Sequence, residues 1–166
     1  MDLGSYHEQD GRPAVRFQRT YPHPVERVWA AVTDEVELAH WFPAQIRIEP
    51  RAGGEVRFGD DGTGRVLVFD PPHRLAFTWG GDELQLRLEP VEEGCRLTLI
   101  DVLADGRTAA RNGAGWHVCL DELTKWLDGI ASDGPHGQTA TPWQPTYDAY
   151  LAAGMPSGAP IPGRST

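Results

Sequence analysis

An acidic residue stands inside a run of apolar residues that has the pattern of a buried strand. Asp101 interrupts the segment LTLIDVL. A carboxylate among apolar neighbours costs several kcal/mol unless it is paired or protonated. Asp101 therefore points outward, pairs with an arginine of a neighbouring strand such as Arg87, or lies inside a cavity. In a cavity it would orient an otherwise apolar ligand.

The residue patterns of nucleophilic and metal-dependent enzymes do not occur in the sequence. The serines lie only in terminal or tail segments, and no G-x-S-x-G, C-x-x-C or H-E-x-x-H motif is present. Cys119 and His117 are two residues apart on a predicted helix, so their side chains face different directions. His117 and Asp121 share a helix face, which is typical of a hydrogen-bonded surface pair. We predict no catalytic residue set, no metal site and no cofactor.

Aromatic residues of the predicted helices and strands supply the material for an apolar pocket. Most of them must belong to the core, but together they are also what lines a deep ligand-binding cavity. The predicted lining of one contiguous apolar space is Trp41, Phe58, Phe77, Trp79, Trp116 and Leu120. Asp101 and His117 complete the predicted ligand-binding set as polar anchors, and Arg57 is a third candidate anchor.

The elements that would position these residues follow from two periodicities. Period-two alternation predicts strands over 14–21, 45–49, 55–58, 63–69, 74–79, 83–89 and 96–103. Helical periodicity predicts two short helices, 24–33 and 35–41, and a long helix over 108–129. Gly113 and Gly115 predict an irregular or late start of the long helix, or a close approach of another group to its backbone.

The order of these elements predicts an α+β fold. A curved antiparallel sheet of about seven strands would wrap around the long C-terminal helix, with two short helices after the first strand. The gap between the sheet and the long helix is the natural cavity. We expect an N-terminal extension over 1–13, the domain over 14–130 and a Pro- and Gly-rich tail over 131–166.

The tail contains large apolar residues that are poor solvent residues. A short helix is predicted between Pro145 and Gly154, because proline favours helix starts and glycine favours helix ends. So short a helix is marginal on its own, so it must dock on the body or on a second subunit, which would make a homodimer. The residues expected to dock are Trp143, Tyr147, Tyr150 and Leu151.

Composition and charge exclude several classes of protein. The 166 residues carry 15 Lys and Arg against 24 Asp and Glu, a net charge of -9, which disfavours nucleic acid as a partner. No apolar run approaches the roughly 18 residues of a membrane span. The polar, acidic start is not a signal peptide, so we expect a cytoplasmic protein with both cysteines reduced.

Five segments in order resemble a known family. YPHPVERVWAAVTDEVELAHWFP resembles the opening of START-like (SRPBCC) proteins, and more narrowly of the family named for the activator of the heat-shock protein 90 ATPase. AGGEVRF, PPHRLAFTWG and RLTLIDVL resemble strands of that family, and ARNGAGWHVCLDELTKWLDG resembles its C-terminal helix. The similarity covers roughly 14–130 and implies the helix-grip fold. The family often has His where this chain has Asp101, a departure that argues against a histidine-dependent role.

The resemblance does not select one function, because the family has no common catalytic residue set. Its members include ligand carriers, aromatic-polyketide cyclases, stress-related proteins and a cochaperone domain. Our first hypothesis is the binding of a small, mostly apolar molecule between the sheet and the long helix. The alternatives are a protein-interaction domain, as in the cochaperone, and a cyclase- or dehydratase-type enzyme with Asp101 as general acid or base.

Overall fold

Eight antiparallel strands form one open sheet in the computed structural model, which describes residues 1–162. The sheet order is β1-β2-β8-β7-β6-β5-β4-β3. The strands are β1 (Ser5–Gln9), β2 (Arg12–Tyr21), β3 (Arg47–Ile48), β4 (Glu55–Arg57), β5 (Thr63–Asp70), β6 (Arg74–Trp79), β7 (Asp82–Val91) and β8 (Gly94–Val102). The helices are α1 (Val25–Thr33), α2 (Glu35–Leu38), α3 (Ala109–Leu127), α4 (Trp143–Ala152) and a short 3-10 turn, Gly106–Thr108.

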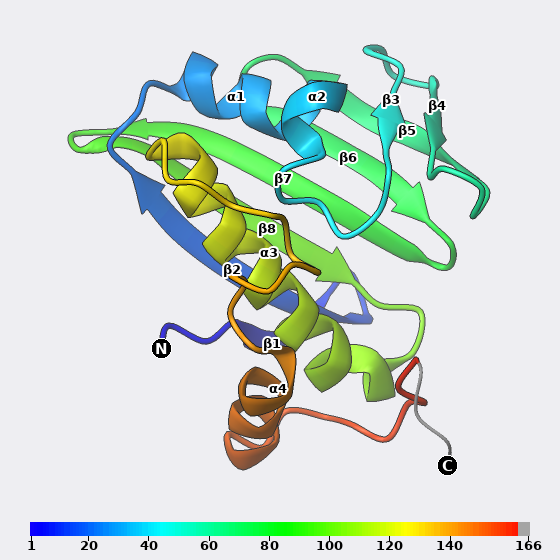
Figure 1. The fold of residues 1–166 in the computed structure, drawn as a ribbon. Helices are drawn as coiled ribbons and strands as arrows, with labels where there is room; N and C mark the ends of the chain where they lie inside the picture. The colour runs from blue at the N-terminus through cyan, green and yellow to red at the C-terminus, as the bar shows by residue number, and fades with distance from the viewer. Residues whose placement is uncertain (163–166) are drawn as a thin grey trace.

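The long helix α3 crosses one face of the curved sheet, so the arrangement is the α+β fold predicted from the sequence (Figure 1). The chain leaves β2 through α1 and α2, reaches the far edge at β3, and then returns strand by strand to β8 beside β2. The side chain of Asp34 begins α2 by accepting hydrogen bonds from the backbone N–H groups of Val36 (3.0 Å) and Glu37 (3.2 Å).

The register of β8 decides where Asp101 points. Leu97 and Leu99 belong to the main core, whereas Ile100 and Val102 form a separate small cluster with Ala14. Successive strand residues face opposite sides of a sheet, so Asp101 shares the face of Leu99 and points toward α3. Arg87 pairs with Thr98, on the opposite face, and cannot meet Asp101. Of the three arrangements open from the sequence, only the buried, inward one occurs.

The N-terminal residues add a strand that the sequence analysis did not predict. Ser5–Gln9 pairs with β2 across the two-residue turn Asp10-Gly11, where both residues have positive φ angles (51° and 79°). Such turns match the twist of a β-hairpin. The strand lies at the sheet edge with a mostly exposed pattern, so SYHEQ shows no apolar alternation. The sheet consequently has eight strands instead of about seven.

The glycines of α3 do not interrupt the helix. It begins at Ala109 and continues through Gly113 and Gly115, so the predicted irregular or late start is wrong. The alternative, a close approach, holds at Gly113, where an added Cβ would lie 3.2 Å from Met155 Sδ and 3.5 Å from the Tyr150 ring. An added Cβ at Gly115 would meet no atom within 4 Å. The absence of a side chain at Gly113 therefore allows the tail to pack closely on α3, and Gly115 borders open space.

The tail helix α4 packs on α3 (Figure 1). It begins at Trp143, two residues before Pro145, and ends at Ala152, two residues before Gly154, whose φ of +85° suits a helix stop. Tyr150 is fully buried and Tyr147 nearly so, whereas Leu151 is exposed. The segment after α4 returns to the start of α3, where Pro156 O accepts a hydrogen bond from Ala110 N (2.9 Å). No helix within residues 1–162 combines the length and apolar composition that crossing a bilayer requires.

Candidate functional site

A pocket of about 690 Å³ opens between the sheet and the first half of α3. Its floor comes from the β6–β7 hairpin and the end of β8, and one wall comes from α3. Pro43, Trp143 and the segment after α4 complete the rim. The lining residues are Pro43, Trp79, Gly80, Asp82, Leu84, Asp101, Arg111, Asn112, Gly115, Trp116, Trp143, Ile161 and Pro162.

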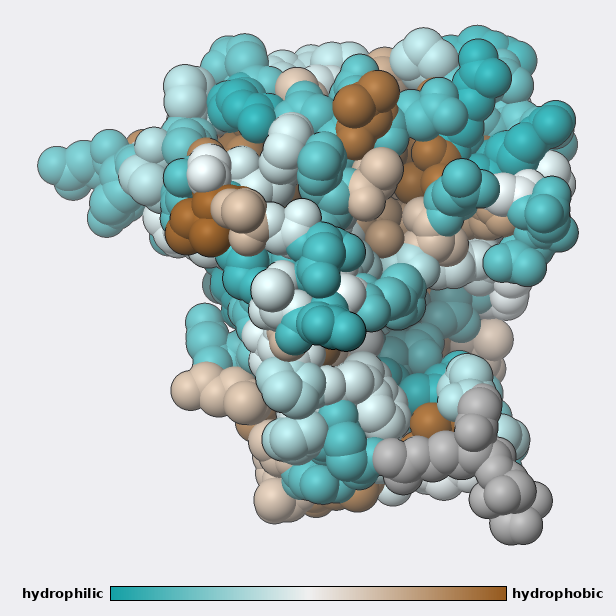
Figure 2. All heavy atoms as spheres, in the orientation of Figure 1, coloured by the Kyte–Doolittle hydropathy of each residue, from teal (hydrophilic) through white to brown (hydrophobic). Residues whose placement is uncertain are grey.

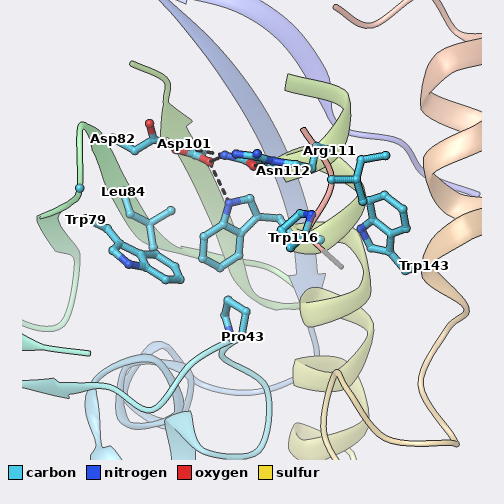
Figure 3. Close-up of a pocket in the computed structure, with 13 residues that line it drawn as sticks. Pro43, Trp79, Asp82, Leu84, Asp101, Arg111, Asn112, Trp116 and Trp143 are labelled. Atoms are coloured by element: carbon cyan, nitrogen blue, oxygen red, sulfur yellow. Dashed lines mark hydrogen bonds between the residues drawn. The ribbon is translucent and has the colours of Figure 1, made fainter. Parts of the chain in front are cut away.

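Two carboxyl groups meet at one end of this pocket (Figure 3). Asp101 is 3% exposed, and its Oδ2 accepts hydrogen bonds from Trp116 Nε1 (3.0 Å) and Asn112 Nδ2 (3.2 Å). The same Asn112 Nδ2 also donates to Asp82 Oδ2 (3.3 Å), and Asp82 Oδ1 accepts from Ala104 N (2.9 Å). A single amide group therefore bridges an acid of β7 and an acid of β8.

This environment favours the neutral form of Asp101. Burial, the charge of Asp82 and a hydrogen bond with that carboxyl together raise the pKa of Asp101 to about 8, against the lowering effect of the hydrogen bonds from Trp116 and Asn112. Two carboxylates in contact cannot both ionise easily in an apolar pocket, so the pair holds a proton at neutral pH. A buried acid that is neutral at pH 7 can donate a hydrogen bond or a proton.

Arg111 lies on the pocket wall without neutralising the acids. Its Nε donates to Asn112 Oδ1 (3.1 Å), and its Nη1 donates to the backbone carbonyl of Pro160 (2.8 Å). Because Asn112 Oδ1 is held in this way, the amide nitrogen of Asn112 points toward the two acids. Arg111 thus positions Asn112 and ties the C-terminal segment to the pocket rim.

Aromatic rings form the apolar walls, and other aromatic rings hold them in place. The indole of Trp79 lies edge-to-face with that of Trp116, with 6.2 Å between the ring centroids. Phe58 stacks on Trp79 at 4.8 Å with an interplanar angle of 9°, and Phe42 stacks on it at 5.3 Å. Trp143 stacks on Tyr147 of its own helix at 4.7 Å. These contacts fix the walls before any ligand binds.

Three of the eight residues predicted to bind a ligand line the pocket: Trp79, Asp101 and Trp116. The other five lie in the packed core: Trp41, Phe58, Phe77, His117 and Leu120.

The prediction that all six apolar residues line one continuous space is therefore wrong in its extent, because most of them are packed inside the core. Trp41 is fully buried and its Nε1 donates to Ala31 O (2.9 Å). Phe58 stacks on Trp79, and Phe77 packs against Phe58. Leu120 lies one turn beyond Trp116 along α3. Arg57, the third candidate anchor, is exposed and bonds Glu55 (3.0 Å).

His117 binds the tail helix instead of a pocket ligand. Its Nδ1 lies 3.0 Å from the hydroxyl of Tyr150, and that hydroxyl accepts a hydrogen bond from Gly4 N (2.8 Å). Burial lowers the pKa of His117, which favours the neutral imidazole, and its unprotonated Nδ1 accepts a hydrogen bond from the Tyr150 hydroxyl. Phe17 packs edge-on against both rings. His117 therefore joins three distant segments of the chain, and the predicted surface pair with Asp121 does not form, because Asp121 accepts from Thr141 Oγ1 (2.7 Å).

Sequence reasoning missed several pocket residues. Asp82 stands in an acidic turn pair, which resembles an ordinary solvated turn, although Asn112 bridges it to Asp101. Asn112 precedes Trp116 by four residues, a spacing that places both on one face of a helix. That spacing, taken with Asp101, was a usable signal. Ile161 and Pro162 carry no local signal, because their place depends on how the tail returns to α3. Residues 1–162 contain no gathering of three or more His, Cys, Asp or Glu side chains suited to a metal ion.

The sequence matches one family model: the model described as activator of Hsp90 ATPase homolog 1-like protein matches residues 22–128. No curated protein sequence matches the chain.

Several solved structures share the fold. The solution structure of CalU16 from Micromonospora echinospora has a TM-score of 0.71 at 24% identity, over 90% of this chain and 92% of that one. A conserved protein of unknown function from Enterococcus faecalis has a TM-score of 0.72 at 18% identity, over 90% and 89%. A protein of Rhodobacter sphaeroides reaches 27% identity with a TM-score of 0.59, over 76% and 95%. These likenesses confirm the predicted helix-grip fold.

Proposed function

The chain belongs to the family of activator of Hsp90 ATPase homolog 1-like proteins, and from that premise we propose that it binds a small, mostly apolar molecule without transforming it. The ligand would occupy the pocket between the sheet and α3. Membership of this family is compatible with ligand binding, but the fold alone does not identify the ligand.

One observation carries the proposal: a pocket of about 690 Å³ has apolar walls and a small polar end. Small-molecule sites in proteins commonly measure about 300–1,000 Å³ and combine apolar lining with a few placed polar groups. Trp79, Trp116 and Leu84 supply the apolar surface, and Asp82 with Asp101 supply the polar end. The stacking of Phe58 and Phe42 on Trp79 supports a pre-formed site, which reduces the ordering cost of binding.

The test uses the open space beside Gly115. We expect some members of a panel of neutral aromatic and aliphatic compounds to raise the melting temperature of the wild type. The shift arises because a bound ligand stabilises the folded state, by about 2.7 kcal/mol of unfolding free energy when the ligand concentration is 100 times the Kd. Gly115→Ala should retain these shifts, whereas Gly115→Leu should abolish them because its side chain fills the pocket. Shifts that survive in Gly115→Leu, or a panel without any effect, would contradict the proposal.

A second candidate function is acid–base catalysis, which the raised pKa of Asp101, about 8, favours. A neutral carboxylic acid in a pocket at pH 7 can protonate a substrate and take the proton back. If the protein converts a compound, Asp101→Asn should retain binding of that compound and lose at least about 100-fold in turnover. Turnover that persists in Asp101→Asn would remove this candidate.

A protein-interaction role stays a prediction. On the face shown in Figure 2, hydrophilic residues cover most of the surface and apolar residues form separated spots. Docking surfaces usually present a contiguous apolar patch. We also propose a cytoplasmic location, which the two buried free thiols, Cys95 and Cys119, support, because such thiols persist in a reducing compartment.

A further inference from the structure

We propose that the ligand of this pocket carries a protonated amine, which binds to the carboxyl groups of Asp82 and Asp101. The inference rests on the proposed function and adds the chemical class of the ligand. It predicts an apolar or aromatic body with an ammonium group at one end.

The hydrogen-bond donors around the acid pair explain why a cation fits there. The donors that reach the two carboxyls are the amide of Asn112, the indole of Trp116 and the backbone N–H of Ala104. All three are neutral. Among residues 1–162, neither Asp82 nor Asp101 takes part in an ion pair within 4.0 Å. The pair therefore has carboxylate oxygens and potential negative charge, and its surroundings supply no matching positive charge.

Arg111 is the basic residue on the pocket lining, and its hydrogen bonds lead elsewhere. They go to Asn112 Oδ1 and to the carbonyl of Pro160. The groups packed around Asp101 from the neighbouring strands are Val15 on β2 and Leu84 on β7, both apolar. Neither neighbouring strand thus brings a cation to Asp101, and Arg111 of α3 forms no ion pair with it within 4.0 Å, so a ligand can supply the positive charge.

An ammonium group suits the two carboxyl groups at this end of the pocket. It carries three N–H donors and one positive charge, so it can satisfy both carboxyls and allow both to ionise. An anionic head group would face two acids in a chain of net charge -9 and is disfavoured.

The experiment compares two probes of the same shape, 2-(2-naphthyl)ethylamine and 2-(2-naphthyl)ethanol. Calorimetry at pH 6–9, in buffers with different ionisation enthalpies, measures affinity and proton release. We expect the amine to bind at least about tenfold more tightly than the alcohol at pH 8.5. Its affinity should rise about tenfold per pH unit below pH 8 and then level off, with release of about one proton at pH 6.5. The alcohol should show neither effect.

Matched variants locate the effect. Asp101→Asn and, separately, Asp82→Asn should reduce the preference for the amine to below about threefold and remove proton release. Asp60→Asn, which removes one charge from an exposed turn between β4 and β5, should behave as the wild type. Thermal melts show which variants are folded, and two pocket variants keep the test decisive if one does not fold.

Three results would overturn the inference. If amine and alcohol bind equally and Gly115→Leu blocks both, the pocket binds ligands without selecting amines, and the proposed function stands. If neither naphthyl probe binds while neutral members of the compound panel do, the amine class is likewise wrong. An amine preference that persists in both pocket variants would place the amine at another site and also overturn it.

Discussion

Two polar clusters lie next to each other on α3 and each contains buried polar groups, yet they differ in how completely those groups are satisfied. The tail cluster consists of His117, Tyr150 and the backbone of Gly4, and each polar group in it has a partner. The pocket cluster consists of Asp82, Asp101, Asn112 and Trp116, and its two acids depend on one proton. Their anchors, Trp116 and His117, are consecutive residues that point to different sides of the helix.

The comparison separates burial for structure from burial for function. In the tail cluster the polar atoms join the N-terminal segment, α3 and α4, and the ring of Phe17 closes the space around them. In the pocket cluster the polar atoms border a space of about 690 Å³. Proteins tolerate an unbalanced buried charge mainly where a site requires it. The pocket cluster is therefore the one that we assign to ligand binding.

The largest expected effect comes from deleting the C-terminal segment that supplies Tyr150 to the tail cluster. Deletion of 140–166 removes α4 and Met155, which cover α3, and leaves His117 without its partner. We expect a loss of about 3–5 kcal/mol or more, as for truncation of a large buried aromatic side chain. Urea unfolding and ultracentrifugation measure stability and mass. A truncated chain that melts like the full chain and has the same oligomeric state would show that α4 contributes nothing to stability or assembly. A change from dimer to monomer would show that the tail forms a dimer contact.

A smaller change tests the hydrogen bonds of the tail cluster alone. Tyr150→Phe keeps the ring and removes the hydroxyl, so Gly4 N and His117 Nδ1 lose their partner. The expected loss is about 1–3 kcal/mol, the cost of leaving buried polar groups unpaired. Denaturant melts at pH 7.5 measure it, and Tyr147→Phe on the same helix is the control. A loss below about 0.5 kcal/mol would mean that water replaces the hydroxyl without cost.

The pocket cluster should respond in the opposite direction. Asp101→Asn keeps the acceptor for Trp116 and Asn112 and gives Asp82 a permanent donor, so it imitates the protonated acid. We expect it to stabilise the empty protein by about 1 kcal/mol or more at pH 8, because each pKa unit corresponds to about 1.4 kcal/mol. The folded-state pKa is raised, so wild-type stability falls as pH rises through about 8. The gain from the variant should therefore grow between pH 5 and 8, and a gain independent of pH would contradict the shared proton.

His117 should give the reverse pH dependence. Burial lowers its folded-state pKa, so its contribution to stability is present above the unfolded value of about 6.5 and is lost as pH falls below it. His117→Asn retains an acceptor for Tyr150 and should weaken the acid-side loss of stability between pH 6.5 and 5. Melts across this range check the prediction. If the variant loses as much stability as the wild type between pH 6.5 and 5, other titrating groups cause that loss.

The smallest expected effects concern the two glycines of α3. Gly115→Ala should stabilise the protein by about 0.5–1 kcal/mol, because alanine is the better helix former and the new methyl group meets open space. Gly113→Ala should bring little gain or a loss, because its methyl group presses on Met155 and Tyr150. Thermal melts of the two variants measure the effect of the same glycine-to-alanine substitution on two sides of α3. Equal gains would show that the tail does not press on Gly113.

The sequence predicted the inner sheet and the long helix well, because period-two and helical patterns are strong where one face is buried. Strand 74–79 has the bounds of β6, and the orientation of Asp101 follows from the alternation of LTLIDVL once the neighbouring strands are known. Edge strand β1 escaped prediction because exposed strands lack that alternation, although the Asp10-Gly11 turn was a local signal.

The candidate site was harder to predict, because it depends on which apolar residues remain at a surface. Trp41 and Trp79 look equivalent in sequence, yet the first is fully buried and only the second lines the pocket. Asp82 became part of the site only through the pairing of β7 with β8. The rim residues Ile161 and Pro162 depend on the return path of the tail, which no periodicity specifies.

The most direct test of the assignment is the titration of the Asp101 carboxyl in the ligand-free protein, followed by carbon-13 NMR of labelled aspartate and identified with Asp101→Asn. We predict a pKa near 8, raised by burial and by Asp82, as expected for an acid pair that holds one proton at the end of a pocket. Titration near the ordinary value for Asp, about 4, would show a solvated carboxylate without a shared proton and would contradict the assignment of this cluster to ligand binding.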